Sequence, residues 1–412
     1  MMRRFLPFIF SVLFLAGCAG ITKDGGPDPI PDLRLSAVSF DDLNIPEAQK
    51  NGFLKAFRIS CLSLMKRSPD KTVSPEIPAK TENGAALRLG GVAGDWFPAC
   101  QAVSKDMDDV ALDAFLREHF NAYQVYDGAR DQTGLFTGYY EPLLFGSKVK
   151  TKRFHYPLYE RPSELIDVDL GAFREDLKGM RIAGKVEGKK FVPFADRSEI
   201  DEGALKGRGL EILYVDDPIK AFFLHIQGSG VVEFPNGKRQ RVGYAGQNGH
   251  LYYAIGRRLI DDGVVAKEDM SLQVIDAWLR ENPDKAEALM WENPSYILFR
   301  KLDGDAPLGA QGVPLTPYHS LAVDRRLIPY GMPVLLSYED AESKNTRTLM
   351  MVAQDTGGAI RGAVRGDVFW GAGDTAEQRA GTMKAEGSYV IFVPNTVAVP
   401  EKWLTRGSLN LW

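Results

Sequence analysis

The stretch AQDTGGAIRGAVRGDVFWG, residues 353–371, places two aspartates on either side of a glycine-rich segment. Asp355 ends an apolar, strand-like run, and Asp367 begins another that continues into Phe369 and Trp370. Glycine lets backbone and ligand approach closely, so this segment can fold both carboxyl groups into one cleft. Apolar neighbours disfavour an ionised carboxylate, and we therefore expect Asp367 to hold a proton near neutral pH.

A proton-loaded carboxylic acid suits the cleavage of a glycosidic bond, because the bridging oxygen must receive a proton. A hydrolase usually adds a second carboxylate as nucleophile or base. Asp324, in AVDRRLIPYG (residues 322–331), is the third aspartate that adjoins a strand-like run. Asp355 has a second interpretation, since Asp-Thr-Gly-Gly also forms a turn in which the aspartate bonds its own backbone.

Three polar, glycine-bearing segments have the side chains that a saccharide needs: FTGYYEP (136–142), QGSG (227–230) and YAGQNGH (244–250). Aromatic rings suit the apolar faces of sugars, although buried core tyrosines explain the rings equally well. The candidate substrate-binding residues are Thr137, Tyr139, Tyr140, Gln227, Ser229, Tyr244 and Asn248. His225 is interpreted as a structural histidine in a strand.

The beginning of the chain predicts a compartment. A short basic start precedes Phe5–Ala16, which is apolar but too short to span a bilayer, and Leu15-Ala16-Gly17-Cys18 has the form of a bacterial lipoprotein cleavage site. Residues 1–18 are then a signal peptide, and Cys18 is the lipidated first residue of the mature protein. An ordinary signal peptide with an incidental cysteine is the alternative. Ala19 favours the outer membrane, to which the acylated chain is anchored rather than inserted.

Cys61 and Cys100 are the two further cysteines, and an oxidising compartment predicts a disulfide between them. A buried free thiol at Cys61 is the alternative. The cysteines and the five histidines lack the spacing of zinc ligands, so we expect no metal and no cofactor. The formal net charge of −4, with mixed signs, gives no basic surface for nucleic acid.

The chain of 412 residues is long enough for two domains. Residues 19–40 read as a flexible tether. Amphipathic periodicity predicts helices within 46–66, 105–120 (with Val110, Ala114, Phe115 and His119 inward), 252–260 and 269–279. Short β-type runs occupy 191–194, 210–215, 221–226, 320–323, 333–338, 348–353 and 388–393. Asp374 to Glu377 has the form of a helix capping box.

Taken together, these motifs resemble the membrane-bound lytic murein transglycosylase A (MltA) family. The stretches that carry the resemblance are 136–142, 227–230, 244–250, 260–270, 293–295 and 324–381. The C-terminal part looks like the family's three-aspartate (3D) module, represented by Asp324, Asp355 and Asp367. Arg365-Gly366 stand where some members have a His-Phe pair, so the immediate surroundings of Asp367 depart from that pattern.

The resemblance implies a mainly β protein with peripheral helices. Its core is a double-psi β-barrel formed by residues 41–141 and 305–400, an inserted β-domain spans 142–304, a tail covers 401–412, and a glycan lies in a groove between the two domains. It also implies a polysaccharide lyase that cleaves the β-1,4 bond between N-acetylmuramic acid (MurNAc) and N-acetylglucosamine (GlcNAc) without water, leaving a 1,6-anhydroMurNAc end.

In that mechanism Asp367 is the single general acid and base, Asp355 supports it, and Asp324 braces the barrel. The expected partners are peptidoglycan strands, the outer membrane through the lipid anchor, and cell-wall synthesis or hydrolysis complexes. The location is the periplasm of a Gram-negative bacterium. A glycoside hydrolase on the same barrel and a non-catalytic peptidoglycan-binding lipoprotein are the alternatives.

Overall fold

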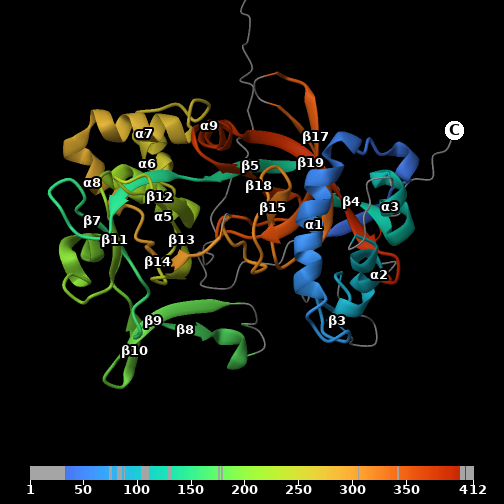
Figure 1. Ribbon diagram of the computed structural model, residues 1–412, viewed down its shortest axis with the longest axis horizontal. Coiled ribbons are helices and arrows are strands. Elements are labelled where there is room, and N and C mark those ends of the chain that lie inside the picture. Colours follow the sequence, from blue (N-terminus) through green and yellow to red (C-terminus); the bar gives the residue numbers. More distant parts are fainter. Residues whose placement is uncertain are drawn as a thin grey trace, which may run out of the picture.

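The computed structural model describes residues 33–73, 77–80, 86–87, 89–103, 111–128, 131–174, 177, 180–304, 306–340, 343–399 and 404. Its architecture is mainly β, with helices at the periphery of the sheets (Figure 1). The expected signal peptide with Cys18, most of the expected tether and nearly all of the expected tail lie outside the described residues. The described end of the expected tether is not a free linker, because Arg34–Ala37 form a strand that pairs with Phe120–Tyr126. Among the described residues, no helix has the length and apolar character needed to cross a membrane.

The largest sheet has eight strands and joins the two ends of the described chain. Strand β19 also pairs with β5, and this pairing closes β19, β16, β17, β15, β18 and β5 into a ring. The pairs β15–β17 and β18–β5 are parallel, and the other pairs of the ring are antiparallel. The strands in sheet order are β1 (Arg34–Ala37), β4 (Phe120–Tyr126), β19 (Lys384–Pro394), β16 (Pro333–Glu339), β17 (Thr346–Asp355), β15 (Ser320–Val323), β18 (Arg365–Ala372) and β5 (Gly134–Glu141).

Strand β15 and most of β16 are buried on both faces, because one face lines the inside of the ring and helices or other strands cover the other. Val334, Leu335 and Leu336 follow one another in β16, and all three are buried. Such runs lack the alternation of a half-exposed strand. Helix α1 (Lys50–Leu64) packs against β17, and Figure 1 shows α1, α2 (Ala93–Val103) and α3 (Leu112–His119) on the side of the ring away from the second sheet.

Helix α1 has the face that its periodicity predicts: Phe53, Phe57, Cys61 and Leu64 are all buried. Cys61 forms a disulfide with Cys100 of α2. The prediction for 105–120 is right only in part, because α3 begins at Leu112 and residues 104–110 lie outside the described chain. Ala114 is exposed rather than inward, while Phe115 and Leu116 face the core.

A second, six-stranded sheet lies beside the ring. Its strands in order are β14 (Ile297–Leu302), β13 (Arg239–Gln247), β12 (Ser229–Glu233), β6 (Leu143–Ser147), β11 (Glu211–Val215) and β7 (Tyr156–Tyr159). A three-stranded sheet of β8 (Ile166–Asp169), β9 (Arg181–Glu187) and β10 (Lys190–Pro193) extends below it in Figure 1, and β2 (Ile77–Lys80) pairs with β3 (Ala86–Leu87). The remaining helices are α4 (Arg197–Glu199), α5 (Pro218–Gln227), α6 (Ile255–Asp261), α7 (Leu272–Glu281), α8 (Pro283–Trp291) and α9 (Asp374–Thr382).

Two local predictions are wrong. The run 221–226 belongs to helix α5, which Asp217 caps by accepting hydrogen bonds from the N–H groups of Ile219 and Lys220, and which ends at Gly228 with φ 77°. His225 is therefore a buried helix residue that bonds the N–H of Ile297, not a strand histidine.

The second wrong prediction is the helix capping box at residues 374–377. Helix α9 begins at Asp374 itself, and the N-cap is Gly373, which has no side chain to cap with. Gly373 has φ 89°, a backbone conformation that suits glycine, so the chain enters this helix through backbone geometry. The Glu377 carboxylate instead bonds the hydroxyl of Tyr140.

The chain leaves the ring after β5 and returns after β14, and one arginine holds both crossings. Arg241 of β13 donates to the carboxylate of Glu141 at 2.9 Å and to the carbonyl oxygen of Gly304 at 2.9 Å. Glu141 is 1% exposed. Burial raises its pKa, and the hydrogen bonds and charge of Arg241 oppose that shift.

Replacing Arg241 with Met should destabilise the protein by about 3–5 kcal/mol, because it leaves a buried carboxylate without its partner. Arg239→Met is the matched control: it lies two residues away and pairs with Glu233 at the surface, so its loss should cost at most about 1 kcal/mol. Denaturant unfolding of both variants measures the difference. Equal losses would show that Arg241 does not join the two sheets.

Candidate active site

The three aspartates lie around one strand. β15 is flanked by β17 and β18, and Ala322 of β15 is the cross-strand partner of both Asp355 and Asp367. Asp324 follows β15 directly. The closed ring thus brings together carboxyl groups that the sequence places on three separate strand ends.

Asp367 is held from the neighbouring strand β5. Thr137, its register partner, donates a hydrogen bond from Oγ1 to Asp367 Oδ1 at 2.8 Å, and Arg365 Nη2 donates to the same Thr137 oxygen at 2.8 Å. Burial raises the pKa of Asp367 to about 6, against the opposing effects of the Arg365 charge and the Thr137 hydrogen bond. The residue keeps some accessible surface, and its carboxyl group can carry a proton close to neutral pH.

Asp355 is more fully engaged. Its Oδ2 accepts from the hydroxyl of Tyr139 at 2.8 Å, and its Oδ1 accepts from the N–H groups of Ala310 and Thr356, each at 2.9 Å. The bond to the N–H of Thr356 is the local turn contact expected from the Asp-Thr-Gly-Gly sequence, and the bond to Tyr139 connects Asp355 to strand β5. Burial raises the pKa of Asp355, and these three donors oppose that shift. The carboxyl group is oriented on both oxygens.

Asp324 is an ion-pair residue. It has no exposed surface, and it pairs with Arg326 at 2.7 Å while accepting from the N–H of Gly362 at 3.0 Å. Burial alone raises its pKa, but the bonds from Arg326 and Gly362 outweigh burial and lower it. Asp324 therefore stays ionised and fixes the segment between Asp355 and Asp367.

The predicted substrate-binding residues fall into three groups. Thr137 and Tyr139 contact the aspartates, and Tyr244, on β13, is 54% exposed. Tyr140 is buried against Glu377, and Asn248 is fully buried and bonds the backbone of residues 195, 294 and 296. The structure thus gives Tyr140 and Asn248 internal roles.

Gln227 and Ser229 lie at the junction between β5 and the second sheet. Gln227 ends α5, and its Oε1 accepts from the N–H of Tyr140 at 3.1 Å. Ser229 begins β12 opposite Gly243. Both residues are partly exposed.

Arg365 lies beside Asp367 and contacts Thr137, and the sequence analysis gave it no role. The sequence singled out Arg365-Gly366 only because the pair stands where the resemblance implies a His-Phe pair in some family members. Gly366 allows the close packing of β18: a Cβ there would lie 2.9 Å from Leu321 and 3.0 Å from the ring of Phe136. The contact from Arg365 to Thr137 spans 228 positions of the chain, so no local pattern reveals it.

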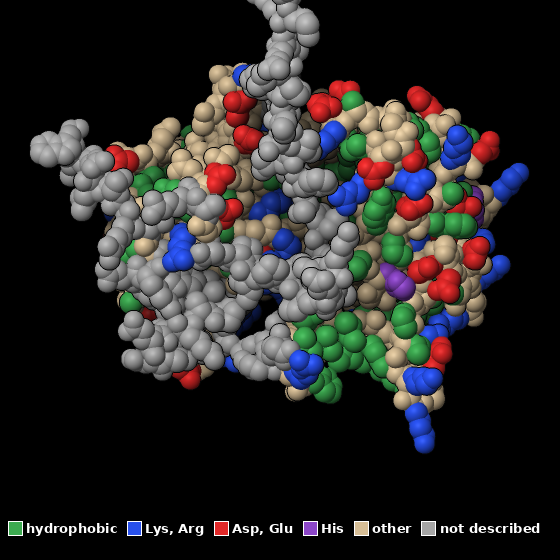
Figure 2. All heavy atoms as spheres, turned by 180° about the vertical axis from the view of Figure 1, so that it is seen from behind, with side chains coloured by type: hydrophobic (Ala, Val, Ile, Leu, Met, Phe, Trp, Pro, Cys, Tyr) green, Lys and Arg blue, Asp and Glu red, His purple; other side chains and the backbone are tan. Residues whose placement is uncertain are grey.

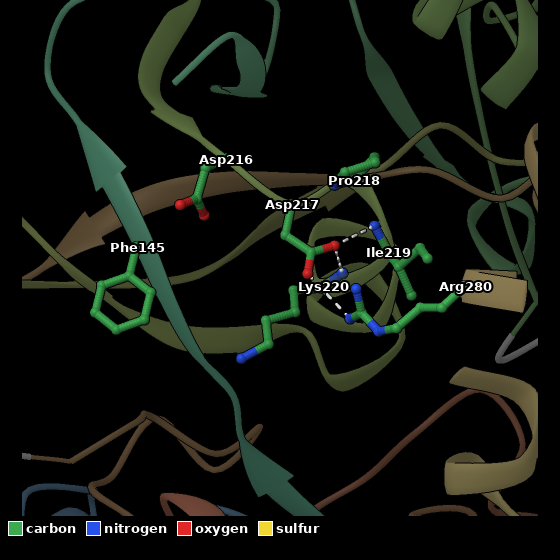
Figure 3. Close-up of a pocket in the computed structure, with 7 residues that line it drawn as sticks. All are labelled: Phe145, Asp216, Asp217, Pro218, Ile219, Lys220 and Arg280. Carbon is green, nitrogen blue, oxygen red and sulfur yellow. Dashed lines mark hydrogen bonds and ion pairs between the residues drawn. The ribbon is translucent and has the colours of Figure 1, made fainter. Parts of the chain in front are cut away.

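One pocket beside the second sheet offers no free carboxylate for this chemistry. A pocket of about 420 Å³ is lined by Phe145, Asp216, Asp217, Pro218, Ile219, Lys220 and Arg280 (Figure 3). Asp217 caps α5 and pairs with Arg280, and Asp216 pairs with Arg153, so both carboxylates already have partners. Within the described chain, no group of three or more His, Cys, Asp and Glu side chains is arranged to hold a metal ion.

Similarity to known proteins follows the same division of the chain. The profile of the MltA specific insert domain matches residues 135–300, and that of the 3D domain matches residues 319–393. The membrane-bound lytic murein transglycosylase A of Vibrio cholerae is 32% identical over 273 residues, which cover 65% of this chain and 67% of the relative. The chain belongs to the membrane-bound lytic murein transglycosylase A family.

Solved members of this family share the fold. The membrane-bound lytic murein transglycosylase of Agrobacterium tumefaciens superposes with a TM-score of 0.74 at 29% identity, covering 88% of this chain and 98% of that one. Escherichia coli MltA with bound chitohexaose gives a TM-score of 0.65 at 25% identity, covering 93% of this chain and 99% of that one. The match to the 3D domain contains all three aspartates.

Thr137→Val should raise the pKa of Asp367 above its wild-type value, because the Thr137 hydroxyl favours the ionised carboxylate. Arg365→Met should shift it in the same direction. Carboxyl ¹³C NMR of Asp367 across pH measures both shifts. Thr133→Val, at an exposed position on the same segment, is the control and should leave the pKa unchanged. A pKa at or below the wild-type value in Thr137→Val contradicts the assigned contact.

Proposed function

We propose that this enzyme, a peptidoglycan lytic transglycosylase by family, cleaves the MurNAc-β-1,4-GlcNAc bond with Asp367 as its single acid and base. The supporting observation is the carboxyl group of Asp367, whose pKa burial raises to about 6 and which Thr137 orients. The E. coli relative has been solved with chitohexaose, a sugar oligomer, bound, and the substrate class of this enzyme is accordingly a glycan strand.

The reaction proceeds in two proton transfers. Protonated Asp367 donates its proton to the bridging oxygen, the bond from that oxygen to C1 of MurNAc breaks, and GlcNAc leaves with a free hydroxyl. The Asp367 carboxylate then takes the proton of the MurNAc O6 hydroxyl as O6 bonds C1. Asp367 is thereby reloaded, and the product is a 1,6-anhydroMurNAc end. No water is consumed, and the intramolecular nucleophile gains from its proximity.

The surroundings of the other two aspartates favour this single-acid scheme. A hydrolase needs a second carboxylate free to attack C1 or to activate water. Asp355 already accepts from three donors, and Asp324 is paired with Arg326. In the proposal, Asp355 orients the sugar and supports the positive charge that develops at C1, while Asp324 holds the segment that connects the two other aspartates.

The glycan groove of the proposal lies between the ring and the second sheet. We assign the ring, with its two parallel pairs, as a double-psi barrel that contributes Thr137 and Tyr139 to one wall. Gln227, Ser229 and Tyr244 contribute to the other. Tyr244 supports this placement because it is an aromatic side chain that is 54% exposed on β13. Tyr140 and Asn248 position the walls rather than contact sugar.

The cellular setting of the proposal is the periplasm, with acylated Cys18 anchored in the outer membrane. Turnover and remodelling of the cell wall are the processes served. Cell-wall synthesis or hydrolysis complexes are the candidate protein partners.

Asp367→Asn should lower the release of anhydromuropeptides from purified sacculi by a factor on the order of 10²–10⁴, the usual contribution of a general acid. Mass spectrometry of the products is the measurement. The variant should fold normally, with a melting temperature at pH 7.5 equal to or above wild type, because it removes a charge from a buried position. Asp284→Asn, at an exposed position of α8, is the control. Full activity in Asp367→Asn would remove Asp367 from its role.

The same products separate the proposal from its alternatives. An anhydro end has one water less than a reducing end, and in H₂¹⁸O it carries no label. Labelled reducing ends would identify a glycoside hydrolase. Binding to sacculi without soluble products would identify a non-catalytic lipoprotein.

Activity should decline as pH rises through about 6, since the proton-loaded form of Asp367 falls roughly tenfold per pH unit above its pKa. The basic limb of kcat/KM against pH measures this. Stability should follow the same sign: between pH 3.8 and about 6 the folded state binds the proton that the unfolded state has lost, so the contribution of Asp367 is present at low pH and is lost as pH rises. A flat profile between pH 5 and 8 contradicts the assignment.

A further inference from the structure

The three-stranded sheet β8–β10 has an unusual distribution of side chains. Successive residues of a strand point to opposite faces, and the register pairs Val168 with Ile182 and Val186 with Phe191. One face therefore carries only apolar residues. We call it the apolar arm face, and its side chains are Ile166, Val168, Ile182, Val186, Phe191 and Pro193.

The apolar arm face points away from the body of the protein. The opposite face is the one that packs inward: Ala183 lies against a small hydrophobic core, and Asp167 pairs with Arg161 at 2.8 Å, next to the carbonyl oxygen of Ala245 in β13. A sheet that covers a core normally turns its apolar face toward it and its polar face toward water. This sheet does the reverse.

The exposure of these side chains is high. Val186 is 56% exposed, Ile182 43% and Phe191 39%, and Phe173, in the connection that follows β8, is 75% exposed. Figure 2 shows hydrophobic side chains gathered at the lower edge of the molecule over this sheet. Contiguous exposed apolar patches on a soluble protein mark interaction sites.

Lysines surround the projecting end of the sheet. The turn from β9 to β10 passes through Gly188, with φ 59°, and is followed by Lys189 and Lys190, both exposed. Glu187 is paired with Lys185 at 2.8 Å, which leaves a positive excess at this tip. Figure 2 shows Lys and Arg side chains at the tip, beyond the hydrophobic patch.

Apolar side chains bordered by lysines match the chemistry of an anionic bilayer surface. The apolar groups enter the boundary between headgroups and acyl chains, and the lysines lie at the level of the phosphates. The family is membrane-bound, and the expected acyl anchor at Cys18 would hold the first described residue, Leu33, within about 50 Å of the bilayer even when residues 19–32 are fully extended.

We propose that the apolar arm face docks on an anionic phospholipid bilayer, as a second membrane contact that is separate from the acyl anchor. The acyl group tethers the chain but leaves it free to rotate. Docking of the arm fixes the orientation of the second sheet, and of the groove beside it, relative to the membrane.

Sedimentation with vesicles tests the proposal. The protein used begins at residue 19, so it lacks the expected acyl group and keeps every described residue. It should bind phosphatidylglycerol vesicles at low salt, bind phosphatidylcholine vesicles weakly, and lose affinity as salt rises. The double variant Val186→Asp, Phe191→Asp should lose at least roughly tenfold in affinity. Lys189→Glu, Lys190→Glu should lose about fivefold or more per lysine, on anionic vesicles alone.

Two matched control variants introduce an aspartate at exposed apolar positions outside the apolar arm face. Leu62→Asp in α1, 65% exposed, and Val264→Asp, 50% exposed, should bind vesicles like wild type. All variants should keep wild-type activity on soluble glycan strands, which separates this test from that of the catalytic proposal. If the variant Val186→Asp, Phe191→Asp does not fold, vesicle binding is measured instead with Phe173→Asp and with Lys189→Glu, Lys190→Glu.

Three results overturn the proposal. The first is wild-type protein that stays in the supernatant with anionic vesicles. The second is arm variants that bind as well as wild type. The third is self-association in sedimentation equilibrium that Val186→Asp, Phe191→Asp abolishes, because a second copy of the chain would then be the occupant of the apolar arm face.

Discussion

The pairing of β18 with β5 is the interaction on which the site depends. It joins residues 365–372 to residues 134–141, and it places Thr137 beside Asp367 although 230 positions of the chain separate them. On its other side, β18 meets β15, whose Ala322 also faces Asp355. A buried acid is costly to ionise unless donors surround it. For Asp367 the ring supplies the Thr137 hydroxyl from β5 and the Arg365 charge from β18, and their balance against burial sets how readily Asp367 gives up its proton.

The second sheet depends on the ring through a narrow connection. The chain passes from β5 to β6 through Pro142 and comes back after β14, and Arg241 contacts both passages at Glu141 and Gly304. An ion pair in such a position adds little net stability when complete, because desolvation offsets attraction. The ion pair does favour the one arrangement of the two sheets in which both charged groups keep their hydrogen bonds. The two walls of the proposed groove therefore share this ion pair as well as the contact between Gln227 and Tyr140.

The sequence predicted the parts of this structure that local patterns encode. The apolar period of α1, the strands of the C-terminal region and the three aspartates at strand ends are all visible in short stretches. The helix α5 was misread as a strand, since a short run such as Ala221–Ile226 fits both states and only the flanking Asp217-Pro218 and Gly228 decide between them. Arg365, the buried state of Asn248 and the outward apolar face of β8–β10 depend on partners far along the chain, which no local pattern contains.

The Cys61–Cys100 bridge ties α1 to α2 across a sequence separation of 39 residues. Closing a loop of that size restricts the unfolded chain by about 4 kcal/mol in the chain-entropy account. A cytosol kept reducing by glutathione does not permit such a bond. In a reducing compartment the chain would lack this bond between α1 and α2, the helices that lie beside the ring. Full stability would then be reached only in an oxidising compartment.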